Sequence, residues 1–401
     1  MQRRFTRAAL ATFLAVALLT ALAATAQASS SQRQGATADP VKVGVVYSRT
    51  GLLAAYGAQY IQGLRYGLAY ATKGTNAVKG QKIELELVDD AGDPAKAVSA
   101  AKDLIGKGYK IIVGTVSSGV ALQMAPLAQQ NNILYISGPA ATDALQGINR
   151  NTFRSGRQSY QDVLAASSYL GGGAGKNVVV FAQDSAFGLG NFLAVNQVMG
   201  NLGGQKVQRV LVPLSAQDFT PFATQVKSLK PDLLFVAWAG TTAPAMWRAL
   251  EQQGVFGVVD KVVTGLAERA TYPTFGPVAG KISFLSHYVA NAPVNTVNRF
   301  LVNAMRKRNQ VPDLFTPDGF VAGQMIARAI DKGSASDVGK MISALEGWSF
   351  TGPKGQQTIR ATDHAMLQPM FQVRLVQAGN TYRPQVLKRL RARYTAPPEK
   401  K

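Results

Sequence analysis

From residue 41 onward, short apolar runs alternate with longer amphipathic segments. The first four runs lie at 41–48, 82–90, 110–114 and 133–138. Runs of this length that are apolar almost throughout are typical of strands buried on both faces of a parallel sheet. Between them we expect helices, one over 58–70 and another opened by Asp93 and Pro94, because aspartate caps a helix and proline suits its first turn.

The same alternation begins again after residue 176. The next expected strands lie at 177–183, 207–213, 232–239 and 261–266. The expected helices lie at 159–170, 188–200, from Phe219 onward and at 242–253. Strands and helices in this order form a parallel sheet covered on both faces. We therefore predict an α/β fold with two doubly wound parallel-sheet lobes.

Three further helix patterns follow without a strand between them. They lie at 295–308, 316–331 and 336–346, and a late strand is expected at 368–377. Because no new sheet accompanies these helices, we expect them to pack back onto the first lobe.

The first 28 residues have the pattern of a secretory signal peptide. Arg3, Arg4 and Arg7 precede an alanine-rich apolar stretch over 8–26, and AQA ends at residue 28. A membrane anchor is the alternative interpretation, although the stretch is borderline in length. We expect an exported, periplasmic protein with a flexible segment at 29–40. The sequence has 0 cysteines, which excludes disulfides and lipid attachment at a cysteine.

The formal net charge of +21 raises nucleic acid or an acidic envelope surface as partners. The basic residues are scattered, except for RPQVLKRLRARY at 383–394, and no aromatic residues alternate with them in a binding pattern. We expect a solvated surface with a basic C-terminal tail at 381–401, and no nucleic-acid binding.

The turn GTVSSGV at 114–120 follows a predicted strand and precedes a predicted helix. A serine nucleophile there lacks the G-x-S-x-G pattern and a placed base, since the chain has only His287 and His364. A phosphate cradle lacks its glycine and lysine spacing, because GGGAGK at 171–176 precedes a strand instead of following one. The cluster DDAGD at 89–93 is typical of a turn and helix cap. We expect no enzyme, cofactor or metal.

Binding of a small anion at a helix N-terminus remains. The turns at 116–119 and 138–143 both lie at carboxyl ends of predicted parallel strands, where open α/β sheets bind ligands. Exposed N–H groups and the helix dipole favour a carboxylate there, and Ser117, Ser118 and Thr142 would add hydroxyl donors. Ordinary helix capping is the other interpretation of these side chains.

Several segments together resemble the leucine/isoleucine/valine-binding type of periplasmic solute-binding protein, the receptor of ABC importers. They are VKVGVVYSRTGLLAAYGAQYIQG, LVDDAGDPAKAV, VGTVSSG, ISGPAATDAL and DSAFGLG. The resemblance covers roughly 41–377 and implies a type I periplasmic-binding fold, in which two lobes close on a ligand by hinge motion.

The resemblance also implies domain boundaries. Lobe 1 would comprise 41–156 and 289–364, and lobe 2 would comprise 157–288 and 365–380. Three crossovers between the lobes would fall near 153–158, 284–290 and 362–368.

By the same resemblance, two turns hold the carboxylate and ammonium of an amino acid, and aromatic residues surround its side chain. The corresponding residues are Tyr56, Val116, Ser117, Ser118, Ala140, Ala141, Thr142, Phe187, Trp238 and Glu268. The pocket aromatic of the second lobe falls at Trp238 or Ala239, and the acidic residue that meets the ammonium falls at Ala267, next to Glu268. If Glu268 points away from the cleft, an amide or a non-amino carboxylate becomes the expected ligand.

The sequence therefore predicts a monomeric receptor that delivers a small carboxylate, such as a branched-chain or other apolar amino acid, to the permease of an ABC importer. The alternatives are an aromatic acid, urea or a short amide as the solute, and a ligand-sensing receptor without transport.

Overall fold

The computed structural model describes residues 39–169 and 174–400. The predicted signal peptide, most of the segment at 29–40 and part of the glycine-rich segment at 171–176 lie outside these ranges. Within them, no helix combines the length and the apolar character needed to cross a bilayer.

A six-stranded sheet has the order β2-β3-β1-β4-β5-β6. All neighbours pair in parallel except β2, which is antiparallel to β3. The strands are β1 (Val41–Tyr47), β2 (Ala77–Val78), β3 (Gln81–Asp89), β4 (Ile111–Val113), β5 (Leu134–Ser137) and β6 (Thr152–Arg154). The residues of β1, β4 and β5 are almost all buried, as their apolar sequences predict.

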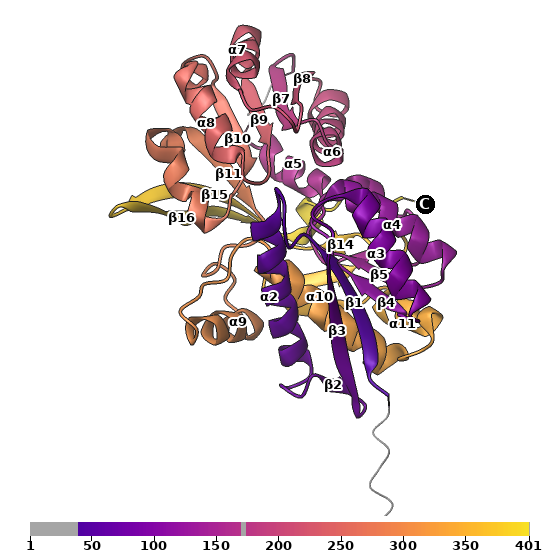
Figure 1. Cartoon of the computed structure of the whole chain (residues 1–401). Helices are drawn as coiled ribbons and strands as arrows, with labels where there is room; N and C mark the ends of the chain where they lie inside the picture. The colour runs from indigo at the N-terminus through magenta and orange to yellow at the C-terminus, as the bar shows by residue number, and fades with distance from the viewer. Residues whose placement is uncertain (1–38, 170–173, 401) are drawn as a thin grey trace, which may run out of the picture. The chain divides into compact units, whose positions relative to one another are not determined.

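Helices cover both faces of this sheet (Figure 1). They are α2 (Ala54–Ala71), α3 (Pro94–Gly106), α4 (Ser118–Gln130), α9 (Thr296–Arg306), α10 (Thr316–Arg328) and α11 (Val338–Leu345), with short helical turns at Asp143–Leu145 and Ala329–Gly333. Helices α10 and α11 share one apolar core with β1, so the prediction that the late helices return to the first sheet is confirmed. Helix α9 packs against α2 and α10 in a smaller cluster.

Glycines allow α2 and α10 to pack with their backbones in contact. A Cβ atom on Gly63 would lie 1.9 Å from Thr316 O, and one on Gly319 would lie 1.9 Å from Tyr60 O. Any side chain at these positions would force the two helices apart. This contact holds α2 directly against α10, and Tyr56 at the start of α2 lines the site described below.

A seven-stranded sheet has the order β16-β15-β11-β10-β9-β7-β8. Its strands are β7 (Asn177–Gln183), β8 (Lys206–Val212), β9 (Leu233–Ala237), β10 (Lys261–Gly265), β11 (Ile282–Ser286), β15 (Met370–Ala378) and β16 (Thr381–Leu390). Only β15 and β16 run antiparallel to their neighbours. The helices are α5 (Ser159–Ser167), α6 (Ala186–Val195) with a π-turn at Asn196–Asn201, α7 (Thr220–Leu229) and α8 (Ala243–Gln252), followed by short helical segments at Val255–Gly257 and Arg269–Lys281.

The chain passes between the two large sheets three times: after β6, after β11 and after β14. A third, small sheet contains β12 (Ser349–Gly352), β13 (Gly355–Ile359) and β14 (Met366–Leu367), all antiparallel. The two α/β units and their connections confirm the predicted fold class.

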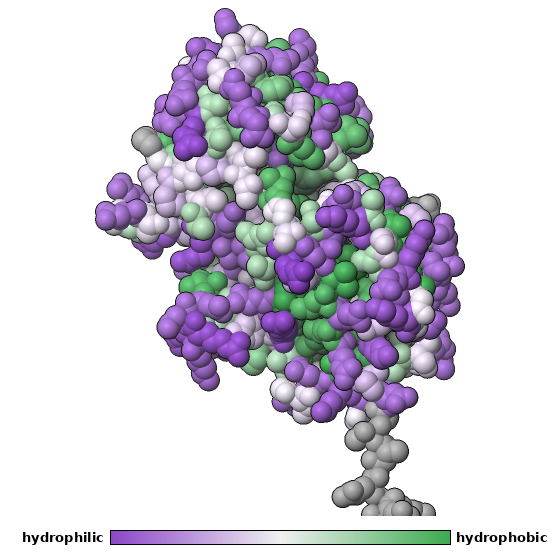
Figure 2. Space-filling model, in the orientation of Figure 1, coloured by the Kyte–Doolittle hydropathy of each residue, from purple (hydrophilic) through white to green (hydrophobic). Residues whose placement is uncertain are grey.

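Several elements were missed by the sequence prediction. No strand was expected at β6, at β11 or at β12–β14. The expected basic tail begins with β16 instead, because Tyr382 and Val386 pack against the core while Arg383 and Gln385 between them are exposed. The end of the chain is also held in place, since Arg360 and Gln146 donate to the carbonyl oxygens of residues 397 and 398. On the face seen in Figure 2 most of the surface is hydrophilic, with apolar residues showing over β1 and β3.

Candidate functional site

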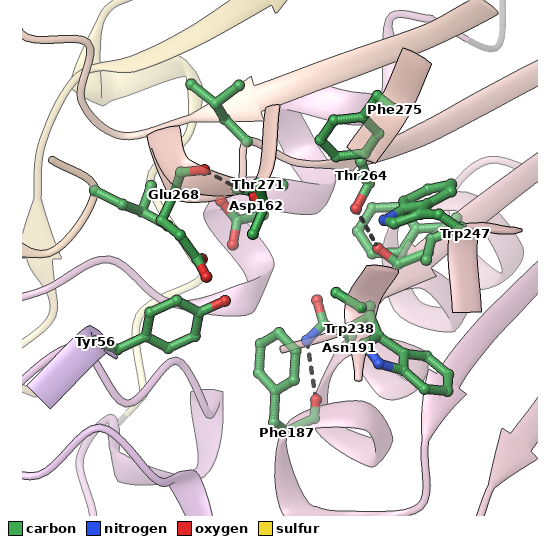
Figure 3. A pocket seen from close by; sticks show the side chains of 18 of the residues that line it. Tyr56, Asp162, Phe187, Asn191, Trp238, Trp247, Thr264, Glu268, Thr271 and Phe275 are labelled. Carbon is green, nitrogen blue, oxygen red and sulfur yellow. Dashed lines mark hydrogen bonds between the residues drawn. The ribbon is translucent and has the colours of Figure 1, made fainter. Parts of the chain in front are cut away.

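Two adjoining cavities lie at the carboxyl ends of the parallel strands, where both α/β units contribute residues. The larger, of about 340 Å³, is lined by the turn before α4 and by the start of α6. The smaller, of about 70 Å³, extends between β9, β10 and the segment after β10 (Figure 3). Tyr56, Arg157 and Phe187 line both cavities. The two spaces therefore adjoin at these three residues and form one candidate site.

The start of α4 contributes two serines with different roles. Ser117 is the helix N-cap, and its hydroxyl accepts a hydrogen bond from Val120 N at 3.4 Å. Ser118 is 3% exposed, and its hydroxyl has no hydrogen-bond partner among the residues that the structure describes. Both line the larger cavity together with Val116 and Ala141. Capping thus occupies Ser117, whereas Ser118 retains a free donor beside the helix N-terminus.

Asp90 fixes the turn that carries these serines. Its carboxylate accepts hydrogen bonds from Ser48 Oγ at 2.7 Å, from Gly92 N at 2.7 Å and from the hydroxyl of Thr115. In the same acidic cluster, Asp93 caps α3 by accepting from Ala95 N at 2.7 Å. The predicted turn and helix cap at 89–93 are therefore confirmed. Asp90 also holds in place the turn before α4, through its hydrogen bond from Thr115.

Two residues suggested by the resemblance lie outside both cavity linings. Ala140 packs in an apolar cluster against α4, and Thr142 is 3% exposed. The Thr142 hydroxyl accepts a hydrogen bond from Ala144 N at 3.2 Å, so it caps a short helical turn. For Thr142, capping is the role that the structure displays.

Glu268 lies at the wall of the smaller cavity and faces Tyr56 (Figure 3). The Tyr56 hydroxyl accepts a hydrogen bond from Gly240 N at 3.3 Å and interacts with the carboxylate of Glu268. Burial raises the pKa of Glu268, and no lysine or arginine in the described part of the chain forms an ion pair with it. Burial also raises the pKa of Tyr56, which therefore stays protonated. Within the described ranges, the site thus contains a carboxylate that no lysine or arginine pairs with.

The aromatic residues take different positions. Phe187 lines both cavities, as the resemblance implies. Trp238 reaches the smaller cavity, but its Nε1 donates to Thr242 Oγ1 at 3.0 Å and its ring packs 5.4 Å from the ring of Phe219. Ala239, the other aligned position, lines the larger cavity. Trp238 therefore forms part of the wall of the smaller cavity, while its indole N–H and much of its ring contact the protein core.

Sequence reasoning missed several residues of the site. Arg157, in the first crossover, lines both cavities, and its Nε lies 3.2 Å from Asp162 Oδ2. The apolar wall of the smaller cavity includes Phe235, Trp247, Leu266 and Phe275. The wall residues belong to strands and helices whose apolar pattern is that of any core, so no motif marks them. Arg157 carries no signal beyond its place in a predicted crossover.

Comparison with known proteins places this chain in a family. Residues 40–380 match the model of a family described as periplasmic binding protein. The Leu/Ile/Val-binding protein BraC3 of Rhizobium johnstonii is 27% identical over 82% of this chain and 89% of its own. The Leu/Ile/Val-binding protein homolog 3 of Brucella melitensis is 27% identical over 76% of this chain and 83% of its own.

Comparison with solved structures gives a result consistent with this family. An ABC-type branched-chain amino acid transporter protein of Rhodopseudomonas palustris has a TM-score of 0.74 and 30% identity, over 90% of this chain and 100% of that chain. A solute-binding protein of R. palustris in complex with 4-hydroxybenzoate has a TM-score of 0.79 at 21% identity, over 88% of this chain and 97% of that chain, which shows the shared fold. The resemblance found in the sequence is confirmed, and the chain belongs to the periplasmic binding protein family.

Proposed function

We propose that the protein is the extracytoplasmic solute receptor of an ABC importer and that its solute is a branched-chain or other apolar amino acid, bound in the two adjoining cavities. One observation carries the proposal. Among the residues that the structure describes, the Ser118 hydroxyl has no hydrogen-bond partner and the Glu268 carboxylate has no cationic partner, and the cavities that they line meet at Tyr56. These groups complement the carboxylate and the ammonium of an amino acid.

The carboxylate would bind at the start of α4. Backbone N–H groups of a first helical turn lack partners within the helix, and the helix dipole adds a favourable field. At a partly buried site such a field is worth up to about 2 kcal/mol. Ser118 Oγ adds a hydrogen bond to a charged acceptor, worth about 1.5–3 kcal/mol. Ser118 gives up no existing hydrogen bond to do so.

The ammonium would bind at Glu268. A buried ammonium without a counter-charge costs several kcal/mol, which selects strongly for a site that supplies one. Burial raises the pKa of Glu268, and a bound ammonium would shift it back because opposite charges favour the ionised carboxylate. The aliphatic side chain would then fill the smaller cavity against Phe187, Trp247 and Phe275.

Isothermal titration calorimetry tests the proposal with four solutes: L-leucine, L-isoleucine, L-valine and 4-methylpentanoate. The last compound is leucine without its amino group. We expect the amino acids to bind and 4-methylpentanoate to bind about 10- to 100-fold more weakly, since it leaves Glu268 unpaired. In Glu268→Gln this difference should largely disappear, whereas the exposed Glu251→Gln in α8 should behave like wild type. Tighter binding of 4-methylpentanoate than of leucine would contradict the proposal.

An aromatic acid is the second candidate solute. Its support is Arg157, the one cationic side chain among the described residues that line the two cavities. A monocarboxylate without an ammonium would pair with this arginine and would require Glu268 to be protonated. Titration with 4-hydroxybenzoate separates the two candidates: binding of this acid together with no heat from any of the three amino acids would favour the aromatic solute.

A further inference from the structure

Arg157 occupies a position from which it can act on a solute in either cavity. It follows β6 in the first passage between the sheets and precedes α5. Its side chain is 11% exposed, and that exposed part opens into the site because Arg157 lines both cavities. No other lysine or arginine of the described chain lines either of them.

Part of the hydrogen-bonding capacity of Arg157 is unused. A guanidinium carries five N–H donors arranged as a planar fork. Nη1 donates to Pro139 O at 3.3 Å, and Nε lies 3.2 Å from Asp162 Oδ2 without the alignment of a hydrogen bond. Nη2 has no hydrogen-bond partner among the residues at 39–169 and 174–400. The outer edge of the fork is therefore free to pair with an anionic group.

The surroundings of Arg157 hold the fork in one orientation. Asp162 of α5 is largely buried and neutralises the charge from one side. The guanidinium carbon lies 5.8 Å from the centre of the Phe315 ring, and this ring also packs against Tyr56, with 4.8 Å between the ring centres. A guanidinium held between a carboxylate and an aromatic ring loses little conformational entropy when it binds a ligand. The guanidinium of Arg157 is therefore preorganised to bind an anionic group.

We infer that Arg157 is a specificity-determining residue that binds the carboxylate of the solute through its free guanidinium edge, with Asp162 as its positioning residue. The inference rests on the proposed function, because it assigns a role within the same cavities. Ser118 and the N-terminus of α4 would approach the same carboxylate from the larger cavity, which also contains Arg157. The receptor then accepts acids and rejects the corresponding amides, since an amide leaves both the fork and the helix terminus without a charged acceptor.

The test compares an acid with its amide in the purified full-length protein. Calorimetry with L-leucine and L-leucinamide, and with 4-hydroxybenzoate and 4-hydroxybenzamide, covers both candidate solutes. One of these two acids should bind to the wild type. We expect it to bind about 10- to 100-fold more tightly than its own amide. In Arg157→Gln the affinity for the acid should fall to nearly that for the amide, and the affinity for the amide should stay within about threefold. Arg157→Lys should keep part of the preference.

Two further variants separate recognition from folding. Arg157→Gln leaves Asp162 buried without its partner, so the double variant Arg157→Gln/Asp162→Asn provides a neutral pair of similar shape. Arg150→Gln removes an arginine that is 61% exposed and lies outside both cavities, and it should keep the wild-type preference. The double variant should show the same loss of acid preference as the single one.

The outcomes are distinct. A preference for acids that persists in both Arg157→Gln variants overturns the inference while the proposed receptor function stands. Equal losses for acid and amide indicate a structural role and also overturn it. Binding of 4-hydroxybenzoate alone, with a preference that depends on Arg157, supports the inference and refutes the amino-acid part of the proposed function.

Discussion

Lys354 extends from the turn between β12 and β13 into the interior of the protein. Its Nζ lies 2.6 Å from Asp318 Oδ1 of α10 and 3.4 Å from Ser155 O, in the first passage between the sheets. The second oxygen of Asp318 lies 3.4 Å from His287 Nε2, just after β11. The side chains of Lys354 and Asp318 are both 0% exposed. This buried cluster therefore connects α10 to two of the three passages between the sheets.

Replacing Lys354 by methionine removes the charge and keeps the aliphatic stem. Asp318 would remain buried with only His287 beside it, and removing one partner of a buried ion pair typically costs about 3–5 kcal/mol. Urea denaturation followed by circular dichroism measures this loss as a fall in the free energy of unfolding. The double variant Lys354→Met/Asp318→Leu should recover most of it, because an apolar pair of similar volume leaves no buried charge.

Lys340→Met is the matched control for Lys354→Met. Lys340 pairs with Asp337 at 3.7 Å, and the two side chains are 72% and 48% exposed. An exposed pair contributes about 0–1 kcal/mol, so the control should be nearly neutral. A loss below about 1 kcal/mol in Lys354→Met would refute the reasoning, since it would mean that water or another group replaces the ammonium at Asp318.

The same cluster predicts how stability depends on pH. Burial alone would raise the pKa of Asp318, but the ammonium of Lys354 outweighs it and holds the pKa well below its usual range. Burial lowers the pKa of His287, so its ring is neutral in the folded protein near neutral pH. The unfolded chain takes up a proton at His287 below about pH 6.5 and at Asp318 below about pH 4, and each uptake favours unfolding.

Wild type should therefore lose stability as the pH falls below about 6.5, and further below about 4. In Lys354→Met the pKa of Asp318 loses its main depressing influence, so the folded protein takes up this proton at a higher pH and the loss of stability below about pH 4 should become smaller. Denaturation midpoints measured from about pH 3 to 8 test this, and a midpoint independent of pH in wild type would contradict it.

Three smaller changes test other parts of the structure. Gly63→Ala places a Cβ atom 1.9 Å from Thr316 O and should lower stability by about 1–3 kcal/mol in scanning calorimetry; an unchanged melting temperature would mean that α2 and α10 are farther apart. Asp93→Ala removes the cap of α3 and should cost about 1 kcal/mol by denaturation, with a neutral result arguing against the cap. Tyr56→Phe removes the hydroxyl that accepts from Gly240 N, worth about 0.5–1.5 kcal/mol, and should weaken leucine binding severalfold by calorimetry; unchanged affinity would place the solute away from Tyr56.

The parallel strands could be predicted from sequence because burial on both faces of the sheet requires an apolar residue at nearly every position. Strands such as β4 and β5 are buried along their whole length, so each position selects an apolar residue. The small sheet was missed because β13 contains Gln356 and Gln357, which match no strand pattern. In β16, basic residues suggested a solvated tail, and only the inward-facing Tyr382 and Val386 indicate a strand.

The site was predictable where it follows a local motif. Ser118 follows a buried strand at the start of a helix, a context in which both anion binding and helix capping are expected. Thr142 has the same local context, but its hydroxyl is used for capping, which sequence spacing does not distinguish. Arg157 reaches the cavities only because the passage between two sheets brings it there, and its partner Asp162 follows from the start of α5.

A crystal structure of the protein with L-leucine tests the proposed binding mode. We expect leucine within the two adjoining cavities, with its ammonium at hydrogen-bonding distance from the carboxylate of Glu268 and its carboxylate at that distance from Ser118 Oγ. Leucine bound with its ammonium away from Glu268, or at a place that contacts neither residue, would rule this binding mode out.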